Sequence, residues 1–366
     1  MPETFAELSS IAAQFQFRGT LLEAKPYGSG HINDTYRIVI GQGGFQIPYI
    51  LQRLNHRIFA DVPALMDNIT RVTQHVRRKL SARGDSDWSR KVLQLVPTLD
   101  GAQYYRSPDG NFWRAYVFIG GARTYDFVET TDQAREAGRA FGEFQKQLSD
   151  LPEPPLREIL PDFHNTPVRM QNFLRALEAD ACNRAGLARP EIEFALAHQP
   201  MVSRVVDLLA DGSLPLRVTH NDTKINNVLL NDEDGRGLCV IDLDTVMPGS
   251  VLYDFGDQIR TTTATSAEDE EDLGKVKFRM DLFANLLHGY LSAADEFLLP
   301  AEKTLLPFSG QLITLEIGLR FLTDFLEGDV YFKTSKANHN LFRCRTQFEL
   351  VRQMERQEQA MQALLK

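Results

Sequence analysis

Cysteine is scarce in this sequence, with three residues among 366. Cys182, Cys239 and Cys344 are isolated, odd in number and without the short spacing typical of metal ligands. This pattern argues against a disulfide-linked secreted scaffold and against a cysteine-based zinc site. We expect reduced thiols with structural roles.

Long apolar runs and an excess of positive charge are also missing. Residues 1–20 mix Glu, Gln and Arg with apolar side chains, unlike a signal-peptide core, and no uninterrupted apolar run approaches the roughly 18 residues of a membrane span. The formal net charge of −9 argues against nucleic acid and anionic membranes as partners. We therefore expect a soluble, cytoplasmic protein that is a monomer or a weak oligomer.

The order of sequence patterns predicts two lobes. A chain of this length can form two hydrophobic cores. Up to about residue 119, apolar residues recur with a period of two between turn-forming segments, whereas helical spacing prevails afterwards. We expect strands at 34–40, 47–54, 92–96, 112–119 and 238–243, and helices at 61–80, 134–148, 168–209 and within 275–366. The prediction is an α+β fold with an antiparallel-sheet N-terminal lobe (1–119) and a mostly helical C-terminal lobe (120–366), with a helical insertion at about 168–209.

The segment His220-Asn221-Asp222-Thr223-Lys224-Ile225-Asn226-Asn227 is the most informative part of the chain, and Asp242 follows fifteen residues after its end. Phosphoryl transfer needs a carboxylate that positions a hydroxyl, a cation beside the transferred phosphate and oxygen ligands for magnesium. We interpret Asp222 as the catalytic base, Lys224 as the cation, and Asn227 with Asp242 as ligands of Mg²⁺. His220 is expected to support the loop by hydrogen bonding. The alternative is an Asx-rich turn between strands whose side chains only cap backbone groups.

Further candidates lie outside this segment. Gly28-Ser29-Gly30 falls between two predicted strands, where backbone N–H groups can approach the phosphates of ATP, although a hairpin turn has the same pattern. Asp244 is a candidate for a second metal or the acceptor substrate, and Asp254 is expected to hydrogen-bond the backbone of the catalytic loop. The remaining acceptor candidates, each with a scaffold role as its alternative, are His31, Asn33, His164 and Arg320.

These motifs resemble those of the aminoglycoside phosphotransferase and choline kinase superfamily, and within it those of the N-acetylhexosamine 1-kinases. The matching segments are 27–36, 49–55, 163–167, 220–227, 240–261 and 319–324. The resemblance implies a protein-kinase-like two-lobe fold, ATP and Mg²⁺ as cofactors, and phosphorylation of the anomeric hydroxyl of N-acetylglucosamine or N-acetylgalactosamine. It also implies that Phe118 and Ile119 begin the hinge that holds adenine.

The chain departs from this superfamily at one position. The superfamily usually has a lysine on the third strand to hold the α- and β-phosphates, whereas this strand reads Leu51-Gln52-Arg53. Successive side chains of a strand point to opposite faces, so only one of the two polar residues can face the cleft. Either Gln52 replaces the lysine as a neutral amide, or Arg53 replaces it as a cation.

Two other functions remain open from the sequence. One is a kinase of another small acceptor, such as an aminoglycoside, an amino alcohol or homoserine. A polycationic acceptor would need an acidic rim, and Glu268–Asp272 supplies one only if it folds back to the cleft. The other is a non-catalytic nucleotide-binding scaffold, for which the missing lysine is the only support.

Overall fold

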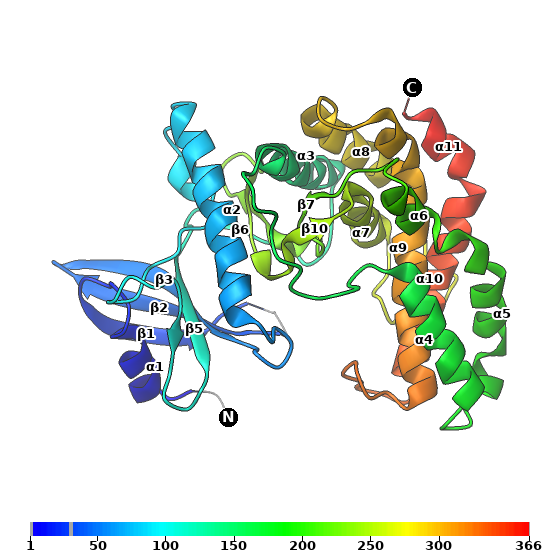
Figure 1. Ribbon diagram of the computed structural model, residues 1–366, viewed down its shortest axis with the longest axis horizontal. Coiled ribbons are helices and arrows are strands. Elements are labelled where there is room, and N and C mark those ends of the chain that lie inside the picture. Colours follow the sequence, from blue (N-terminus) through cyan, green and yellow to red (C-terminus); the bar gives the residue numbers. More distant parts are fainter. Residues whose placement is uncertain (1–2, 29–31, 366) are drawn as a thin grey trace.

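The N-terminal lobe is an antiparallel sheet with one helix on each side (Figure 1). The computed structural model describes residues 3–28 and 32–365. The sheet has the order β1-β2-β3-β5-β4. Its strands are β1 (Thr20–Pro26), β2 (Asp34–Gln42), β3 (Phe45–Leu54), β4 (Tyr105–Arg106) and β5 (Phe112–Val117), and the helices are α1 (Phe5–Ala12) and α2 (Val62–Ala82).

The rest of the described chain is mostly helical, with two small sheets near the N-terminal lobe. The sheets pair β10 with β7 and order the other three strands as β6-β8-β9. The strands are β6 (Ala122–Arg123), β7 (Arg217–Thr219), β8 (Val228–Asn231), β9 (Gly237–Val240) and β10 (Met247–Gly249). The helices are α3 (Thr131–Leu148), α4 (Thr166–Ala179), α5 (Arg189–Ala197), α6 (Arg204–Ala210), α7 (Val251–Thr263), α8 (Met280–Ala294), α9 (Pro300–Glu327), α10 (His339–Arg356) and α11 (Glu358–Ala363).

Local sequence explains where the main helices begin. Thr130 caps α3 by accepting the N–H of Gln133, whose side chain reaches back to the backbone of Thr130, so the two residues form a capping box. Asp61 caps α2 in the same way through the N–H of Ala64. The apolar face of α2 then packs against α3, β8 and β9, so this helix connects the two lobes.

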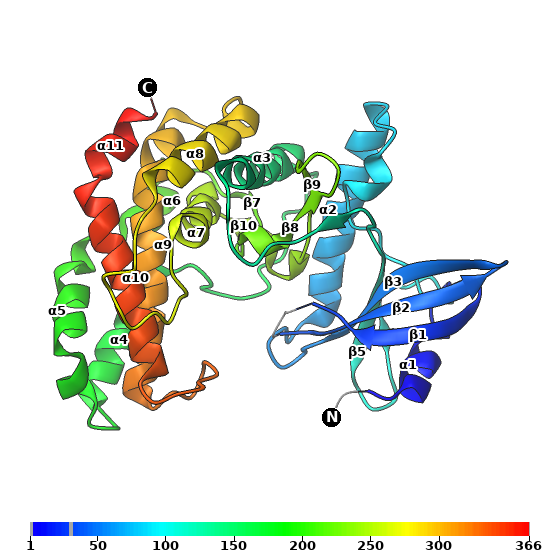
Figure 2. The same cartoon turned by 180° about the vertical axis from the view of Figure 1, so that it is seen from behind.

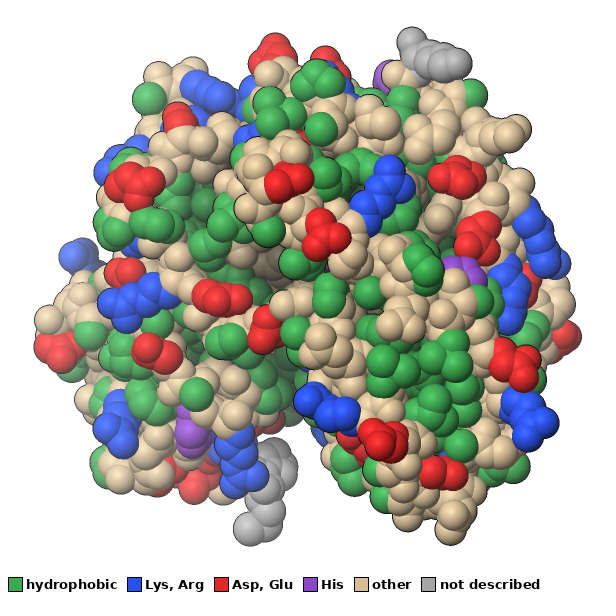
Figure 3. Space-filling view, turned by 45° about the vertical axis from the view of Figure 1, so that its right-hand side comes forward, with side chains coloured by type: hydrophobic (Ala, Val, Ile, Leu, Met, Phe, Trp, Pro, Cys, Tyr) green, Lys and Arg blue, Asp and Glu red, His purple; other side chains and the backbone are tan. Residues whose placement is uncertain are grey.

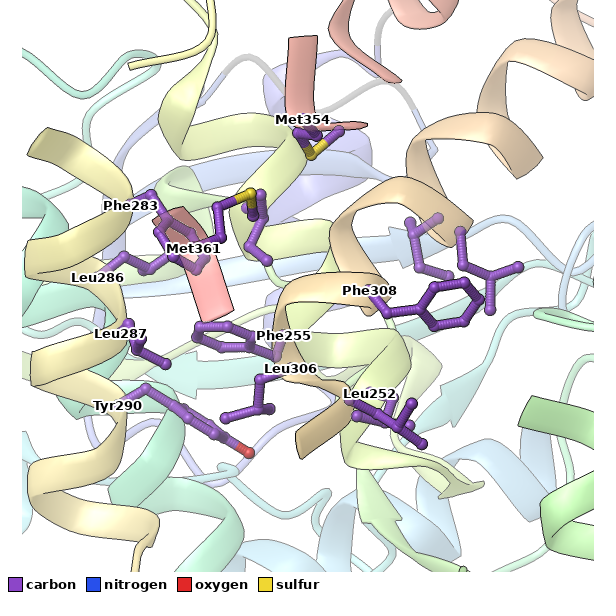
Figure 4. Packing of buried hydrophobic residues seen from close by; sticks show 14 of the residues in the cluster. Leu252, Phe255, Phe283, Leu286, Leu287, Tyr290, Leu306, Phe308, Met354 and Met361 are labelled. Atoms are coloured by element: carbon purple, nitrogen blue, oxygen red, sulfur yellow. The ribbon is translucent and has the colours of Figure 1, made fainter. Parts of the chain in front are cut away.

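The helical core is built around α7, α8 and α9. Phe255 of α7 stacks near Tyr290 of α8 with ring centroids 4.7 Å apart, and Figure 4 shows both rings among Leu286, Leu287 and Leu306. Helix α9 is long and apolar enough to cross a membrane by length and composition, but 89% of its apolar window is buried in the protein. Its composition is therefore that of a core helix.

The predicted fold class is confirmed, and most predicted elements are present. Residues 92–96 are an exception, because in place of a strand they make an isolated bridge between Leu95 and Tyr116. The strand predicted at 238–243 ends at Val240, because Asp242 adopts left-handed backbone angles. The helical insertion predicted at about 168–209 is interrupted between Ala179, where α4 ends, and Arg189, where α5 begins. Dividing the chain at residue 119 remains a prediction, and the connection from β5 to β6 spans that position.

Candidate active site

The loop after β7 is held in place by Asp254, which lies on α7. Its carboxylate accepts the backbone N–H groups of His220 at 2.9 Å and Asn221 at 2.7 Å, and the side-chain amide of Gln145 at 2.6 Å. Asn221 adopts a positive φ of 65°, which these contacts over-determine. The expected role of Asp254 in supporting the backbone of the loop is thus confirmed.

His220 joins this loop to the segment that carries Asp242. Its Nε2 donates to the carbonyl oxygen of Ile241 at 2.9 Å, and its Nδ1 accepts the backbone N–H of Asp222 at 3.3 Å. One ring nitrogen donates and the other accepts, as in a neutral imidazole. The supporting role expected for His220 is confirmed.

Asp222, Lys224 and Asn227 interact directly with one another. The Lys224 Nζ atom lies 2.8 Å from Oδ1 of Asp222, while Nδ2 of Asn227 donates to Oδ2 of Asp222 at 3.1 Å. Desolvation raises the pKa of Asp222, but the nearby Lys224 outweighs it and leaves that pKa below its usual value. Asp222 is therefore an ionised carboxylate at neutral pH, suited to accepting a hydrogen bond from a hydroxyl.

Asp242 is brought to the same place by the ladder between β8 and β9. The N–H of Ile241 donates to the carbonyl oxygen of Asn227 at 2.9 Å, so Asp242 is the next residue beyond a fixed contact with Asn227. Residue 242 is exposed, yet enough protein lies around its carboxylate to desolvate it. Desolvation, followed by the negative charges of Asp244 and Asp222, raises the pKa of Asp242 to about 6. The same concentration of negative charge that makes this carboxylate hold a proton more tightly also attracts a divalent cation.

Asp244 is buried and faces the N-terminal lobe. One of its oxygens accepts from Nδ2 of Asn33 at 2.6 Å, and the other forms a buried ion pair with Nη1 of Arg114 on β5. Arg114 in turn donates from Nε to Oε1 of Gln52 at 2.9 Å. Gln52 is therefore the residue of β3 that lies on the side of the acidic loop.

Arg53 lies on the opposite face of β3. Its guanidinium pairs with Asp34 and Glu3 and stacks over the ring of Trp113. The possibility that Arg53 supplies a cation to the cleft is thus wrong, because strand alternation turns it towards α1 and the N-terminal segment.

The nucleotide candidates Gly28, Phe118 and Ile119 lie at the same end of the N-terminal lobe. Gly28 has a φ of 83°, which favours glycine, and Phe118 contacts the neighbouring Tyr27 edge-on at 5.8 Å. Ile119 is buried at the connection between the lobes. The other candidates in this region, Ser29, Gly30 and His31, lie outside the described residues. Figure 3 shows the surface notched between the two lobes.

The acceptor candidates His164 and Arg320 have different surroundings. His164 is buried, with Nδ1 2.9 Å from Oε1 of Glu316 and Nε2 3.1 Å from the carbonyl oxygen of Asn221. Both of its nitrogens are engaged, so His164 supports the loop that follows β7. Arg320, by contrast, is half-buried and lies over the rings of Tyr331 and Phe332 at 5.9 and 5.5 Å.

Two important residues were not predicted from the sequence. Glu316 carried no local signal, because it is one polar residue on a long apolar helix. Arg114 had a signal, since a charged residue in the apolar run 112–119 is unusual for a buried strand and calls for a charged partner.

Magnesium fits the donors of this loop. Among the described residues no cluster of three or more His, Cys, Asp or Glu side chains forms a metal cage. Mg²⁺ usually binds through one or two protein oxygens together with substrate phosphates and water, so Asp242 and the Oδ1 of Asn227 are a suitable set.

Known proteins resemble this chain in sequence family and in fold. A sequence model of the phosphotransferase enzyme family matches residues 23–296. The fold is similar to that of a microcompartment-associated aminopropanol kinase, with a TM-score of 0.64, 18% identity, and coverage of 99% of this chain and 100% of that one. It is also similar to an aminoglycoside phosphotransferase from Alicyclobacillus acidocaldarius, with a TM-score of 0.63, 11% identity, and coverage of 100% of this chain and 96% of that one. For the AMP-bound spectinomycin phosphotransferase APH(9)-Ia the TM-score is 0.51 and the identity 14%, with coverage of 95% of this chain and 99% of that one.

Proposed function

Because this chain belongs to the phosphotransferase enzyme family, we propose that it transfers the γ-phosphoryl group of ATP to a hydroxyl group of a small molecule. One arrangement carries the proposal: Asp222 is linked to Lys224 and Asn227, and His220 ties the same loop to the residue before Asp242. Asn227 and Asp242 would hold Mg²⁺, which neutralises phosphate charge when the nucleotide is bound.

In this mechanism Asp222 orients the acceptor hydroxyl and accepts its proton. Its lowered pKa makes it a weak base, which suits an acceptor whose hydroxyl is more acidic than that of an ordinary alcohol. The anomeric hydroxyl of a free sugar meets this condition. Lys224, within 2.8 Å of Asp222, is placed to neutralise charge on the phosphoryl group as it is transferred.

The charges near Asp222 favour an uncharged acceptor over a polycation. Arg260 influences both Asp222 and Lys224, so two cations lie near the base. Farther along, desolvation and the neighbouring Arg320 lower the pKa of Arg169, so these two guanidinium groups also lie close together.

We infer that the charges of the acidic run Glu268–Asp272 are too fully paired to serve as an acidic rim for a polycation. Glu268 pairs with Arg260 and Arg343, while Asp269 and Glu271 pair with Lys336. This pairing neutralises much of the run. Together with the sequence resemblance, it supports a neutral sugar as the acceptor, and we propose an N-acetylhexosamine phosphorylated at its anomeric hydroxyl.

The test is a screen of free sugars, amino alcohols and aminoglycosides with Mg·ATP, followed by analysis of the product. A sugar 1-phosphate is a glycosyl phosphate and is labile to acid, whereas an ordinary phosphate ester is stable. We expect an acid-labile product from N-acetylglucosamine or N-acetylgalactosamine. In the Asp222→Asn variant we expect turnover to fall about 10²- to 10⁴-fold while Mg·ADP still binds. An acid-stable product would refute the sugar 1-kinase assignment, and nucleotide binding without any product would indicate a scaffold.

A further inference from the structure

Arg114 is the most deeply buried charge that the N-terminal lobe directs at the acidic loop. It lies opposite Gln52 in the pairing of β5 with β3, and its side chain is 1% exposed. Its Nε atom donates to Gln52, its Nη1 atom pairs with Asp244, and its guanidinium lies 5.2 Å from the ring centroid of Tyr116. A buried guanidinium is stable only when its charge and its donors are matched in this way.

Asp244 is held by the N-terminal lobe on both of its oxygens. Arg114 occupies Oδ1, and Nδ2 of Asn33 occupies Oδ2 at 2.6 Å. Asn33 is itself fixed, because its Oδ1 accepts the backbone N–H of Asn55 at 2.9 Å. With both oxygens engaged, Asp244 is a poor candidate for contact with the acceptor, which was one of the two roles expected from its sequence position.

Asp244 and Asp242 belong to the same short turn. Residues Leu243–Thr245 form a single 3-10 turn whose N-cap is Asp242, with φ 59° and ψ 59°. A side chain fixed on Asp244 therefore fixes the backbone that aims Asp242. The positive charge of Arg114 also interacts electrostatically with both carboxylates, those of Asp244 and Asp242.

We propose that Arg114 is the positioning residue of the magnesium and phosphate site, and that β5 supplies the positive charge that β3 lacks. The guanidinium holds Asp244, and through the shared turn it holds Asp242 in the orientation in which a magnesium–nucleotide complex binds. This inference rests on the proposed function, because it concerns how that site is assembled. Arg53 cannot take this role, since it pairs with Asp34 and Glu3 on the other face of the sheet.

Arginine, and not lysine, is required by this geometry. Nε and Nη1 of one planar group reach two different partners, whereas the ammonium group of lysine is a single point charge on a flexible chain. Arg114→Lys would keep the charge but could not maintain both contacts. Asp244 would then be held by Asn33 alone, and the turn that carries Asp242 would lose one of its two anchors.

The test compares Arg114→Lys with the matched control Arg53→Lys. Binding of Mg·ADP is measured by calorimetry over a range of magnesium concentrations, and folding is checked by circular dichroism and urea unfolding. We expect Arg114→Lys to bind Mg·ADP about tenfold or more weakly and to need more magnesium for half-saturation. Arg53→Lys should remain within about twofold of the wild type. Wild-type binding by Arg114→Lys, or an equal loss in Arg53→Lys, would overturn the proposal.

A second set of variants shows whether Arg114 acts through Asp244. If it does, Arg114→Lys combined with Asp244→Asn should bind Mg·ADP no more weakly than Asp244→Asn alone, whereas independent losses that multiply would overturn this coupling. Should Arg114→Lys fail to fold, Asn33→Ala removes the other contact to Asp244, and an unchanged magnesium requirement in that variant would contradict the proposal. A wild-type protein that binds Mg·ADP but phosphorylates no sugar counts against the proposed acceptor alone, whereas one that binds no Mg·ADP overturns both proposals.

Discussion

His164 and Glu316 form an ion pair that is buried on both sides, with 2.9 Å between Nδ1 and Oε1. The second ring nitrogen of His164 lies 3.1 Å from the carbonyl oxygen of Asn221, so both nitrogens face hydrogen-bond acceptors. Both must therefore donate, which only an imidazolium can do. Desolvation lowers the pKa of His164, but Glu316 outweighs it and raises that pKa above the usual value. Asn221, the residue before Asp222, is thus held by a positive charge on a neighbouring segment.

This ion pair predicts a stability that depends on pH in a definite direction. A histidine whose pKa is raised by folding contributes stability that is fully present below about 6.5, its value in the unfolded chain, and that is lost as pH rises through the folded pKa. We therefore expect the free energy of unfolding to fall above neutral pH in the wild type. The slope should be absent from His164→Gln, as measured by urea unfolding at several pH values.

The same variant should be strongly destabilised at neutral pH. Removing the imidazolium leaves Glu316 buried without a counter-charge, which typically costs about 3–5 kcal/mol. His75→Gln is the matched control, because the partner of His75, Asp150, is exposed and such pairs contribute about 0–1 kcal/mol. Equal losses in the two variants would mean that the His164 pair has no special role.

Asp242 should destabilise the protein in the absence of ligand. Its pKa of about 6 lies above the usual value, so the folded chain binds more protons than the unfolded chain between about pH 4 and 6. Stability contributed by this group therefore falls as pH rises through that window and stays low above it. Asp242→Asn should raise the melting temperature of the free protein at pH 7.5 and abolish the further increase that Mg·ADP gives the wild type.

The control for this prediction is Asp132→Asn at an exposed position on α3, which should change neither quantity. In the wild type, the stabilisation by Mg·ADP should weaken below about pH 6, because protons then compete with magnesium for the carboxylate. A magnesium response that does not change between pH 5 and 7.5 would contradict the role of Asp242 as a ligand.

The parts of the site that sequence could predict are those set by local spacing. The order of Asp222, Lys224 and Asn227 along one loop nearly determines their contacts, and the capping box at Thr130 involves residues three apart. The sequence correctly placed Asp242 near this loop, but it predicted a strand there. The apolar residues Val240 and Ile241 are typical of a strand and give no sign of the left-handed turn that follows them.

The parts that sequence could not predict depend on contacts between distant segments. Whether Gln52 or Arg53 faces the cleft depends on how β3 is oriented relative to the C-terminal lobe, and the partner of Arg114 is 130 residues away. The strand expected at 92–96 had a suitable composition, but its pairing depended on the neighbouring β5, with which only an isolated bridge forms. The pattern of apolar residues predicts whether a segment is a helix or a strand, whereas tertiary packing decides which other segment it pairs with.

Asp324 shapes the loop that packs on Arg320. Its two oxygens accept the backbone N–H groups of Val330, Tyr331 and Phe332 at 2.7–2.9 Å. Asp324→Asn replaces one of the two acceptor oxygens with an NH₂ donor, which leaves at least one of these N–H groups facing a donor, at a cost of about 1–3 kcal/mol. We expect the KM for the acceptor to rise about tenfold while Mg·ADP binding is unchanged, as steady-state kinetics and calorimetry would show.

The control on the same helix is Thr323→Ala, because the hydroxyl of Thr323 bonds only to a carbonyl of its own helix, that of Leu319. It should leave the KM for the acceptor within about twofold. If Asp324→Asn weakens nucleotide binding and acceptor binding alike, the loop acts on the whole fold and not on an acceptor pocket.

Gly289 allows α3 and α8 to approach closely, and the two helices run side by side in Figure 2. A Cβ atom at this position would lie 1.9 Å from the carbonyl oxygen of Arg135, which is backbone and cannot turn aside. Gly289→Ala must therefore separate the helices, and overpacking of this kind costs about 3 kcal/mol or more. At Gly186 a Cβ would meet nothing within 4 Å, so Gly186→Ala should be neutral or slightly stabilising. Urea unfolding of both variants would measure the difference, and equal stabilities would show that the helices pack less closely than described.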